Sequence, residues 1–284
     1  MSKLLTEELI QLERDLKRLK KELFIEMITE GVDDPGILKC VFLAGGPGSG
    51  KSYTAKEIFG VGKTAISSVS AGGLKLVNSD TAFEKALKDN GINPKDLGKF
   101  EKEDPKMWDF IAGEENPNSI RNQAKKITKQ QQAFYEAGRL GLIIDGTGDE
   151  VTKIKEKKAH AESLGYHITI VNTSLEVAQE RNASRDRTLS AERVTQIWKA
   201  CQNNLGAFQS MFSGNFIIVD NTEYKKYQSK FRDRKSGEIK IVDTNIAQNI
   251  QKAIDSFLRK TIYNQIGKKW IETARMLKNA NLIK

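Results

Sequence analysis

Gly45-Gly46-Pro47-Gly48-Ser49-Gly50-Lys51-Ser52 is the stretch of sequence that decides the fold. It matches the pattern G-x-x-x-x-G-K-[ST] at every position. An apolar run, residues 38–44 (LKCVFLA), precedes it, and a segment with helical character follows it. Between a strand and a helix, this pattern is typical of a phosphate-binding loop. Glycines let backbone N–H groups close around phosphate oxygens, and the positive end of the following helix faces the same oxygens.

The loop also predicts roles for single residues. We expect Lys51 to reach the β- and γ-phosphates of a nucleoside triphosphate, and the Ser52 hydroxyl to coordinate Mg²⁺. ATP with Mg²⁺ is therefore the expected ligand. The residues expected to bind it are contiguous: Gly45, Gly46, Pro47, Gly48, Ser49, Gly50, Lys51, Ser52 and Tyr53. The pattern leaves the fate of the γ-phosphate open, because transfer also requires a base, charge for the transition state and a closing element.

Apolar strands and helical stretches alternate along the chain after residue 38. Strands are expected at 38–44, 74–78, 140–145, 166–172 and 215–220, and helices at about 119–138, 150–164, 174–184 and 190–212. This alternation predicts an α/β fold of the P-loop NTPase type, with a parallel sheet covered by helices on both faces. Ligands of such folds bind at the carboxyl ends of the strands. Residues 91–118, which contain three prolines, are expected to form an irregular insertion.

Segments at both ends lie outside this alternation. Near the N-terminus, leucines at spacings of 4, 3, 4, 3 and 4 predict an amphipathic helix: Leu5, Leu9, Leu12, Leu16, Leu19 and Leu23. Docking of this helix on the protein's own body is favoured, and self-association through it stays open. We expect a strand pair within 224–242 and helices near 244–260 and 264–280. The predicted organisation is a helix over 1–35, a core over 36–220 and a basic extension over 221–284.

The net charge is concentrated in the predicted extension. Residues 221–284 hold 15 Lys and Arg against 6 Asp and Glu, which equals the net charge of +9 of the whole chain. Tyr224, Tyr227 and Phe231 alternate there with basic residues, an arrangement suited to single-stranded nucleic acid. A solvated basic helix that binds no partner explains the same charge equally well. Nucleic acid is therefore a possible partner of residues 221–284, and both interpretations stay open.

Composition excludes several classes of protein. Hydrophobic residues make up 38% and charged residues 29% of the chain, which argues against disorder. No run approaches the roughly 18 apolar residues that span a bilayer. Cys40 and Cys201 are the only cysteines, so no disulfide framework is expected. We therefore expect a cytoplasmic protein without a membrane segment.

Two aspartates follow predicted strands and are candidates for chemistry. Asp80, in Asn78-Ser79-Asp80, would lie near the γ-phosphate and could accept a proton from an acceptor hydroxyl. Alternatively, it caps a helix that begins near Thr81. Asp145 ends the third strand and could hold the Mg²⁺ shell or contact the acceptor. A simple strand-end turn is the alternative for Asp145.

Arginines cluster after the fourth strand. Arg181 and Arg185 are four residues apart and would share one face of a helix. At this point of the chain a small kinase places its lid, whose guanidinium groups stabilise the transferring phosphoryl group and exclude water. The alternative is an exposed, charged helix end.

Together these residues resemble a group of P-loop kinases that contains zeta-toxin-type kinases and bacteriophage polynucleotide 5′-kinases. The resemblance covers roughly residues 38–220. It rests on four segments: Gly45–Ser52, Val77-Asn78-Ser79-Asp80, Asp145-Gly146-Thr147 and Arg181-Asn182-x-Ser184-Arg185. It implies Asp80 as the catalytic base and Arg185 as a lid arginine, and its general shape suggests a phage-encoded protein acting in the host cytoplasm.

The chain also departs from this group. Both families usually place an arginine shortly after the aspartate, whereas here Thr81-Ala82-Phe83-Glu84 follows Asp80. The zeta-type pattern continues with an arginine after Gly-Thr, whereas this chain reads Gly148-Asp149-Glu150. The predicted activity is transfer of the ATP γ-phosphate to a hydroxyl of a nucleotide-sugar, a nucleotide or a polynucleotide. An ATPase, a nucleotide switch or an assembly protein without a small acceptor is the alternative.

Overall fold

The computed structural model describes residues 32, 34, 36–59, 73–174, 191–220, 227–232, 239–244 and 248–280. The predicted leucine-rich N-terminal helix lies outside these residues, so self-association through it is untested. Of the helix predicted over 174–184, residues 175–184 also lie outside them, Arg181 and Arg185 included. The side chains of Tyr224, Tyr227 and Phe231 are not among those described.

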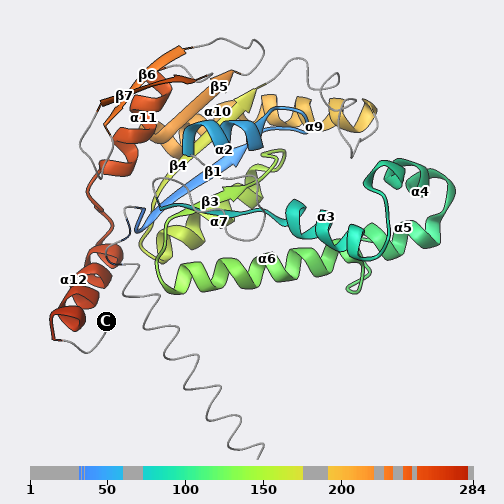
Figure 1. Cartoon of the computed structure of the whole chain (residues 1–284), viewed down its shortest axis with the longest axis horizontal. Coiled ribbons are helices and arrows are strands. Elements are labelled where there is room, and N and C mark those ends of the chain that lie inside the picture. Colours follow the sequence, from blue (N-terminus) through green and yellow to red (C-terminus); the bar gives the residue numbers. More distant parts are fainter. Residues whose placement is uncertain are drawn as a thin grey trace, which may run out of the picture.

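Five parallel strands form the central sheet (Figure 1). In their order across the sheet they are β2 (Lys75–Val77), β3 (Leu142–Asp145), β1 (Lys39–Ala44), β4 (His167–Ser174) and β5 (Phe216–Asp220). Every neighbouring pair is parallel. All six residues of β1 are buried, as expected of a strand covered on both faces. The sequence-based prediction of a parallel α/β sheet is confirmed.

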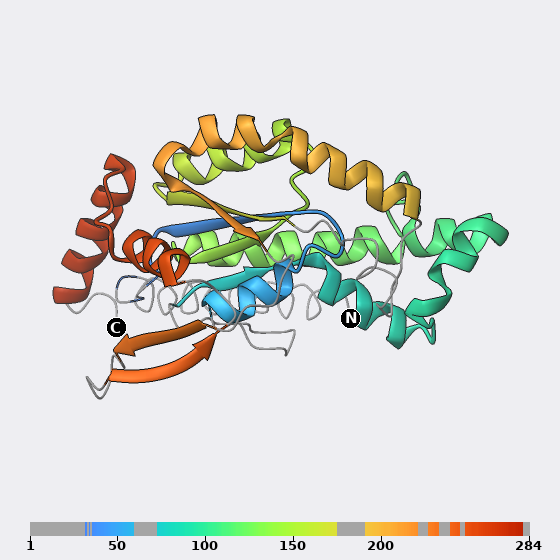
Figure 2. The same cartoon turned by 90° about the horizontal axis from the view of Figure 1, so that it is seen from above.

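Helices cover both faces of the sheet. Alternate residues of β1 point to opposite faces, so Cys40, Phe42 and Ala44 belong to one core cluster while Val41 and Leu43 belong to another. On the first face lie α7 (Val151–Ser163) and α10 (Leu205–Phe212), and on the second lie α2 (Lys51–Phe59) and α11 (Gln248–Arg259). Figure 2 shows these two helical layers on either side of the strands.

This layering predicts a ligand-binding crevice at the carboxyl end of the sheet. Strands β1 and β3 are neighbours, yet the helices that follow them, α2 and α7, pack on opposite faces. Chain segments that leave adjacent strands toward opposite faces open a crevice between them, where α/β proteins bind ligands. The loop 45–52 and Asp145 are the segments that border this crevice.

The prediction of an irregular insertion at 91–118 is wrong. Between α3 (Ser79–Asp89) and α6 (Ile120–Ala137) the chain forms a short 3₁₀ helix, η1 (Pro94–Asp96), and two α-helices, α4 (Leu97–Glu103) and α5 (Pro105–Ala112). Pro94 and Pro105 occupy first-turn positions, where the absent N–H costs nothing. The preceding residues cap these helices, because Asn93 accepts from the Lys95 N–H and Asp104 from the Met107 N–H.

These helices form a core of their own, which we call the helical cluster. Its buried residues are Phe83, Leu87, Ile92, Leu97, Ile111, Ile120 and Ala124. Figures 1 and 2 both show α4 and α5 projecting beyond the carboxyl end of the sheet. The helical cluster therefore stands next to the crevice and is joined to the sheet through α3 and α6.

The helix predicted over 190–212 is divided into α9 (Ala191–Asn203) and α10 by Asn204. The Asn204 side-chain amide donates to the carbonyls of Gly148 and Asp149, at 3.0 and 2.9 Å. The break between α9 and α10 thus coincides with a tertiary contact to the loop after β3. Helical periodicity in the sequence does not reveal this contact.

The predicted division at residue 220 separates α11 and α12 (Gln265–Asn279) from the core. In the structure both contribute to it: Ile254 and Phe257 of α11 are buried under the sheet, and Trp270 of α12 packs against the other core cluster. Two antiparallel strands, β6 (Tyr227–Arg232) and β7 (Ile239–Thr244), precede these helices. Among the described helices, none is long and apolar enough to cross a membrane.

His167 lies buried at the amino end of the sheet, far from the crevice. It is 2% exposed, and neither ring nitrogen has a hydrogen-bond partner among the described residues. The ring stacks on Phe257 at 4.9 Å and meets the edge of Tyr263 at 4.6 Å. Burial, together with the charges of Lys39 and Lys260, lowers the pKa of His167 from 6.5 to about 4.

This burial makes the stability pH-dependent. Between pH 6.5 and 4 the unfolded chain binds a proton at His167 that the folded chain does not. The free energy of unfolding should therefore fall as the pH is lowered through this window, by up to about 3 kcal/mol. In His167→Phe, which keeps an aromatic ring in the stack, that part of the fall should vanish. Urea unfolding at pH 7 and pH 4.5 measures it. His160→Phe, at the exposed histidine, is the control and should keep the wild-type pH dependence. Equal pH dependence in wild type and His167→Phe would contradict the role of His167.

Candidate active site

The loop 45–52 has the backbone that its glycines allow. Gly48 and Gly50 have φ values of 79° and 87°, a region that glycine occupies without strain. The Ser49 N–H donates to the Gly46 carbonyl at 3.2 Å, which closes a turn, and α2 begins at Lys51. The chain thus leads from β1 through a tight loop directly into a helix N-terminus, the arrangement that binds phosphate.

Lys51 lies across this loop. Its Nζ donates to the carbonyl of Gly45 at 2.5 Å and to that of Gly46 at 3.2 Å. The ammonium group is therefore held at the loop, where it contributes positive charge close to any anion bound there.

The segment after β3 is tied to the loop. The Gly45 N–H donates to the Thr147 carbonyl at 2.7 Å, and the Gly146 N–H donates to the Leu43 carbonyl at 3.1 Å. The thiol of Cys201 in α9 also donates to the Thr147 carbonyl, at 3.0 Å. These contacts fix residues 145–149 beside the phosphate loop. Both cysteines are free and buried.

Asn78 links the two candidate aspartates. Its side-chain amide donates to Asp145 Oδ2 at 2.9 Å, while its side-chain carbonyl accepts from the Asp80 backbone N–H at 2.8 Å. One asparagine therefore sets the distance between the end of β3 and the start of α3. The motifs in the sequence assign Asn78 no role, although its place in Asn78-Ser79-Asp80 is a local signal that suggests one.

The charges around Asp145 show that the predicted residues converge. Burial raises the pKa of the Asp145 carboxyl above its ordinary value; the positive charge of Lys51 opposes this rise, and the negative charge of Asp80 adds to it. Lys51 and Asp80 thus both act on the Asp145 carboxyl. The structure brings together three residues that the sequence placed on separate segments.

Asp145 is suited to a cation. Its Oδ1 is buried without a hydrogen-bond partner in the described part of the chain. A buried carboxylate oxygen is costly unless a donor or a cation satisfies it, and Mg²⁺ prefers such oxygen ligands. Ser52 lies in the first turn of α2 with its side chain exposed. The described residues contain no cluster of three or more His, Cys, Asp or Glu side chains that could bind a metal by themselves. A cation held here would share ligands with phosphates.

Asp80 is not the cap of its helix. Helix α3 begins at Ser79, and Asn78 is the capping residue that binds the Asp80 N–H. The alternative interpretation of Asp80 as N-cap is therefore wrong. Its carboxylate is turned to another partner, because Arg121 Nη1 of α6 donates to Asp80 Oδ1 at 2.7 Å. Arg121 is not predicted from the sequence, because it lies 41 residues further along the chain and belongs to no local pattern.

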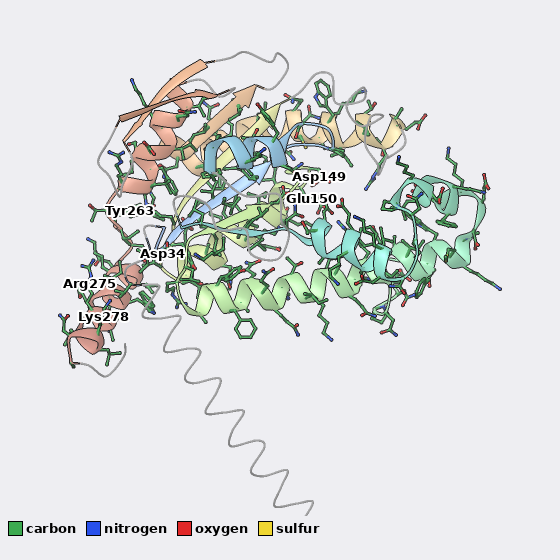
Figure 3. The ribbon with its side chains drawn as sticks, viewed as in Figure 1. Asp34, Asp149, Glu150, Tyr263, Arg275 and Lys278 are labelled. Carbon is green, nitrogen blue, oxygen red and sulfur yellow. The ribbon has the colours of Figure 1, made fainter. Side chains whose placement is uncertain are left out.

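Acidic residues continue along the edge of the site. Asp149 Oδ1 accepts from the Thr147 hydroxyl, and Glu150 pairs with Lys153 at 2.5 Å. Figure 3 shows Asp149 and Glu150 near the carboxyl end of the sheet, well away from Tyr263, Arg275 and Lys278. The basic side chains of α12 are thus remote from the phosphate loop. The lid role of Arg181 and Arg185 stays a prediction.

Comparison with known proteins adds a fold likeness only. No family model and no curated protein matches the chain. Among solved structures, one from the PezAT chromosomal toxin–antitoxin system of Streptococcus pneumoniae has 15% identity and a TM-score of 0.39, covering 86% of each chain. A structure of AvrRxo1-ORF1:-ORF2 with ATP has 10% identity and a TM-score of 0.41, covering 86% of this chain and 74% of that one. The native AvrRxo1-ORF1:-ORF2 complex has 11% identity and a TM-score of 0.43, covering 92% of this chain and 83% of that one. At such scores these likenesses carry no argument about function.

Proposed function

We propose that this protein is a P-loop kinase that binds MgATP on Gly45–Ser52 and transfers the γ-phosphoryl group to a hydroxyl of a second substrate. The observation that carries the proposal is the convergence of Lys51 and Asp80 on Asp145, with Asn78 bridging the Asp145 carboxylate and the Asp80 backbone N–H. A phosphate-binding loop alone is explained by nucleotide binding. A second carboxylate positioned beside it is what transfer to a hydroxyl requires.

Each residue has a distinct role in this proposal. The loop and Lys51 hold the phosphates, and Ser52 and Asp145 hold Mg²⁺. When bound, Mg²⁺ neutralises charge on the phosphate oxygens. Asp80 accepts the proton of the acceptor hydroxyl while the hydroxyl oxygen bonds to the γ-phosphorus and the bond to the ADP oxygen breaks. Arg181 and Arg185 are proposed to stabilise the phosphoryl group from the lid.

The position of Asp80 supports an acceptor site between the sheet and the helical cluster. Asp80 lies in the first turn of α3, the first helix of that cluster, and contacts Arg121 of α6. A nucleotide-sugar, a nucleotide or a polynucleotide end would each present a hydroxyl there. A nucleotide switch that does not transfer phosphate would need no base at this position.

Calorimetric titration tests the nucleotide half of the proposal. MgATP should bind with a stoichiometry near one and with an affinity in the roughly micromolar to millimolar range usual for enzyme substrates. Removal of Mg²⁺ with EDTA should weaken binding, since Ser52 and Asp145 would then lack their cation. Absence of binding to MgATP, and also to other nucleoside triphosphates, would contradict the proposal.

A further inference from the structure

We infer that Arg121 is a positioning residue that holds the Asp80 carboxylate in place for proton transfer and thereby makes the helical cluster part of the active site. The inference rests on the proposed function, because it assigns Arg121 a role through Asp80. Arg121 supplies a positive charge from α6, whereas the residues that directly follow Asp80 in α3 supply none.

Arg121 is itself firmly held. It lies in the first turn of α6 beside Ile120, which is buried in the helical cluster. Its guanidinium lies over the ring of Phe83, 4.9 Å from the centroid, and Phe83 is a buried member of the same cluster. A guanidinium fixed by both an aromatic face and a carboxylate has few alternative positions. The Asp80 Oδ1 that it binds is restricted in the same way.

The exposure of the pair separates a catalytic effect from a structural one. The side chains of Arg121 and Asp80 are 27% and 39% exposed. Ion pairs in contact with solvent contribute little to folding stability. In contrast, displacing a reacting group by about 1 Å can reduce a rate roughly 10²-fold. Loss of Arg121 should therefore slow turnover much more than it destabilises the fold.

Arg121 serves the proton transfer by orienting the accepting carboxylate, which it contacts at Oδ1. The proton then passes from the attacking hydroxyl, or from water when no acceptor is present, to Asp80, while ADP leaves with the electron pair of the broken bond. Arg121 gains and loses no proton in this step.

Basal hydrolysis of MgATP, with water as the acceptor, provides the test. Arg121→Gln should lower kcat by roughly 10- to 100-fold and leave the KM for ATP nearly unchanged. In the double variant with Asp80→Asn, kcat should equal that of Asp80→Asn alone, because Arg121 acts only through that carboxylate. Lys129→Gln removes the same charge from an exposed position of α6 and should keep the wild-type rate.

A rescue experiment distinguishes positioning from a general structural effect. Millimolar guanidinium should restore part of the rate of Arg121→Ala and have no effect on Asp80→Asn. A wild-type rate in Arg121→Gln, or losses that multiply in the double variant, would overturn the inference and leave the kinase proposal intact if Asp80→Asn is slow. A wild-type protein that binds no MgATP and does not hydrolyse it would overturn both.

Discussion

Asp80→Asn should reduce phosphoryl transfer by roughly 10²–10⁴, the usual contribution of a positioned base. ATP affinity should stay nearly intact, because the loop, Lys51 and Ser52 hold the nucleotide. An amide has the shape of the carboxylate but cannot accept the proton. Transfer to an identified acceptor, or basal hydrolysis of ATP, supplies the rate.

The structure sharpens this experiment. Because Asn78 caps α3, replacing Asp80 does not remove the helix cap. Asp89→Asn provides a matched control, since Asp89 lies at the other end of α3 in an exposed pair with Lys85. That control should transfer phosphate at the wild-type rate. Wild-type transfer by Asp80→Asn would end its assignment as base, whereas loss of ATP binding would move Asp80 to the metal site.

Lys51→Ala should abolish tight ATP binding or turnover, with a loss of roughly 10²-fold or more, because its charge stabilises the phosphoryl group throughout transfer. The fold should survive, since the described contacts of the Lys51 ammonium are carbonyls of its own loop. Calorimetric titration measures the affinity and thermal unfolding measures the stability. Lys56→Ala, an exposed position of the same helix, is the control. Unchanged affinity and turnover in Lys51→Ala would mean that the loop binds something else.

The phosphate loop and the sheet could be predicted because their signals are local. A buried strand, the motif and a helix follow one another within residues 39–59, and successive residues of the strand pack on opposite faces of the sheet. Asp145 could be predicted for the same reason, since it directly ends its strand. Asp80 follows β2 after two intervening residues, so its place near the carboxyl edge also follows from the chain order.

Other features could not be predicted, for physical reasons. Pro94 and Pro105 suggest breaks, but a proline in the first turn starts a helix, and only the capping by Asn93 and Asp104 distinguishes the two cases. The contact of Arg121 with Asp80 depends on how α6 packs against α3. Packing of that kind depends on the tertiary core around Phe83, and no spacing along the chain reveals it.

The central claim is that the γ-phosphate of ATP passes to a hydroxyl. The most direct test incubates the protein with Mg²⁺ and γ-labelled ATP, offering nucleotides, nucleotide-sugars and oligonucleotides with 5′-hydroxyl ends in separate reactions. Mass spectrometry of the labelled product would identify the oxygen that carries the phosphate. We predict that the label appears on one acceptor class, that this acceptor accelerates ATP consumption, and that both effects disappear in Asp80→Asn. Release of the label only as inorganic phosphate, at a rate that no acceptor changes, would contradict the account and identify a nucleotide hydrolase or switch.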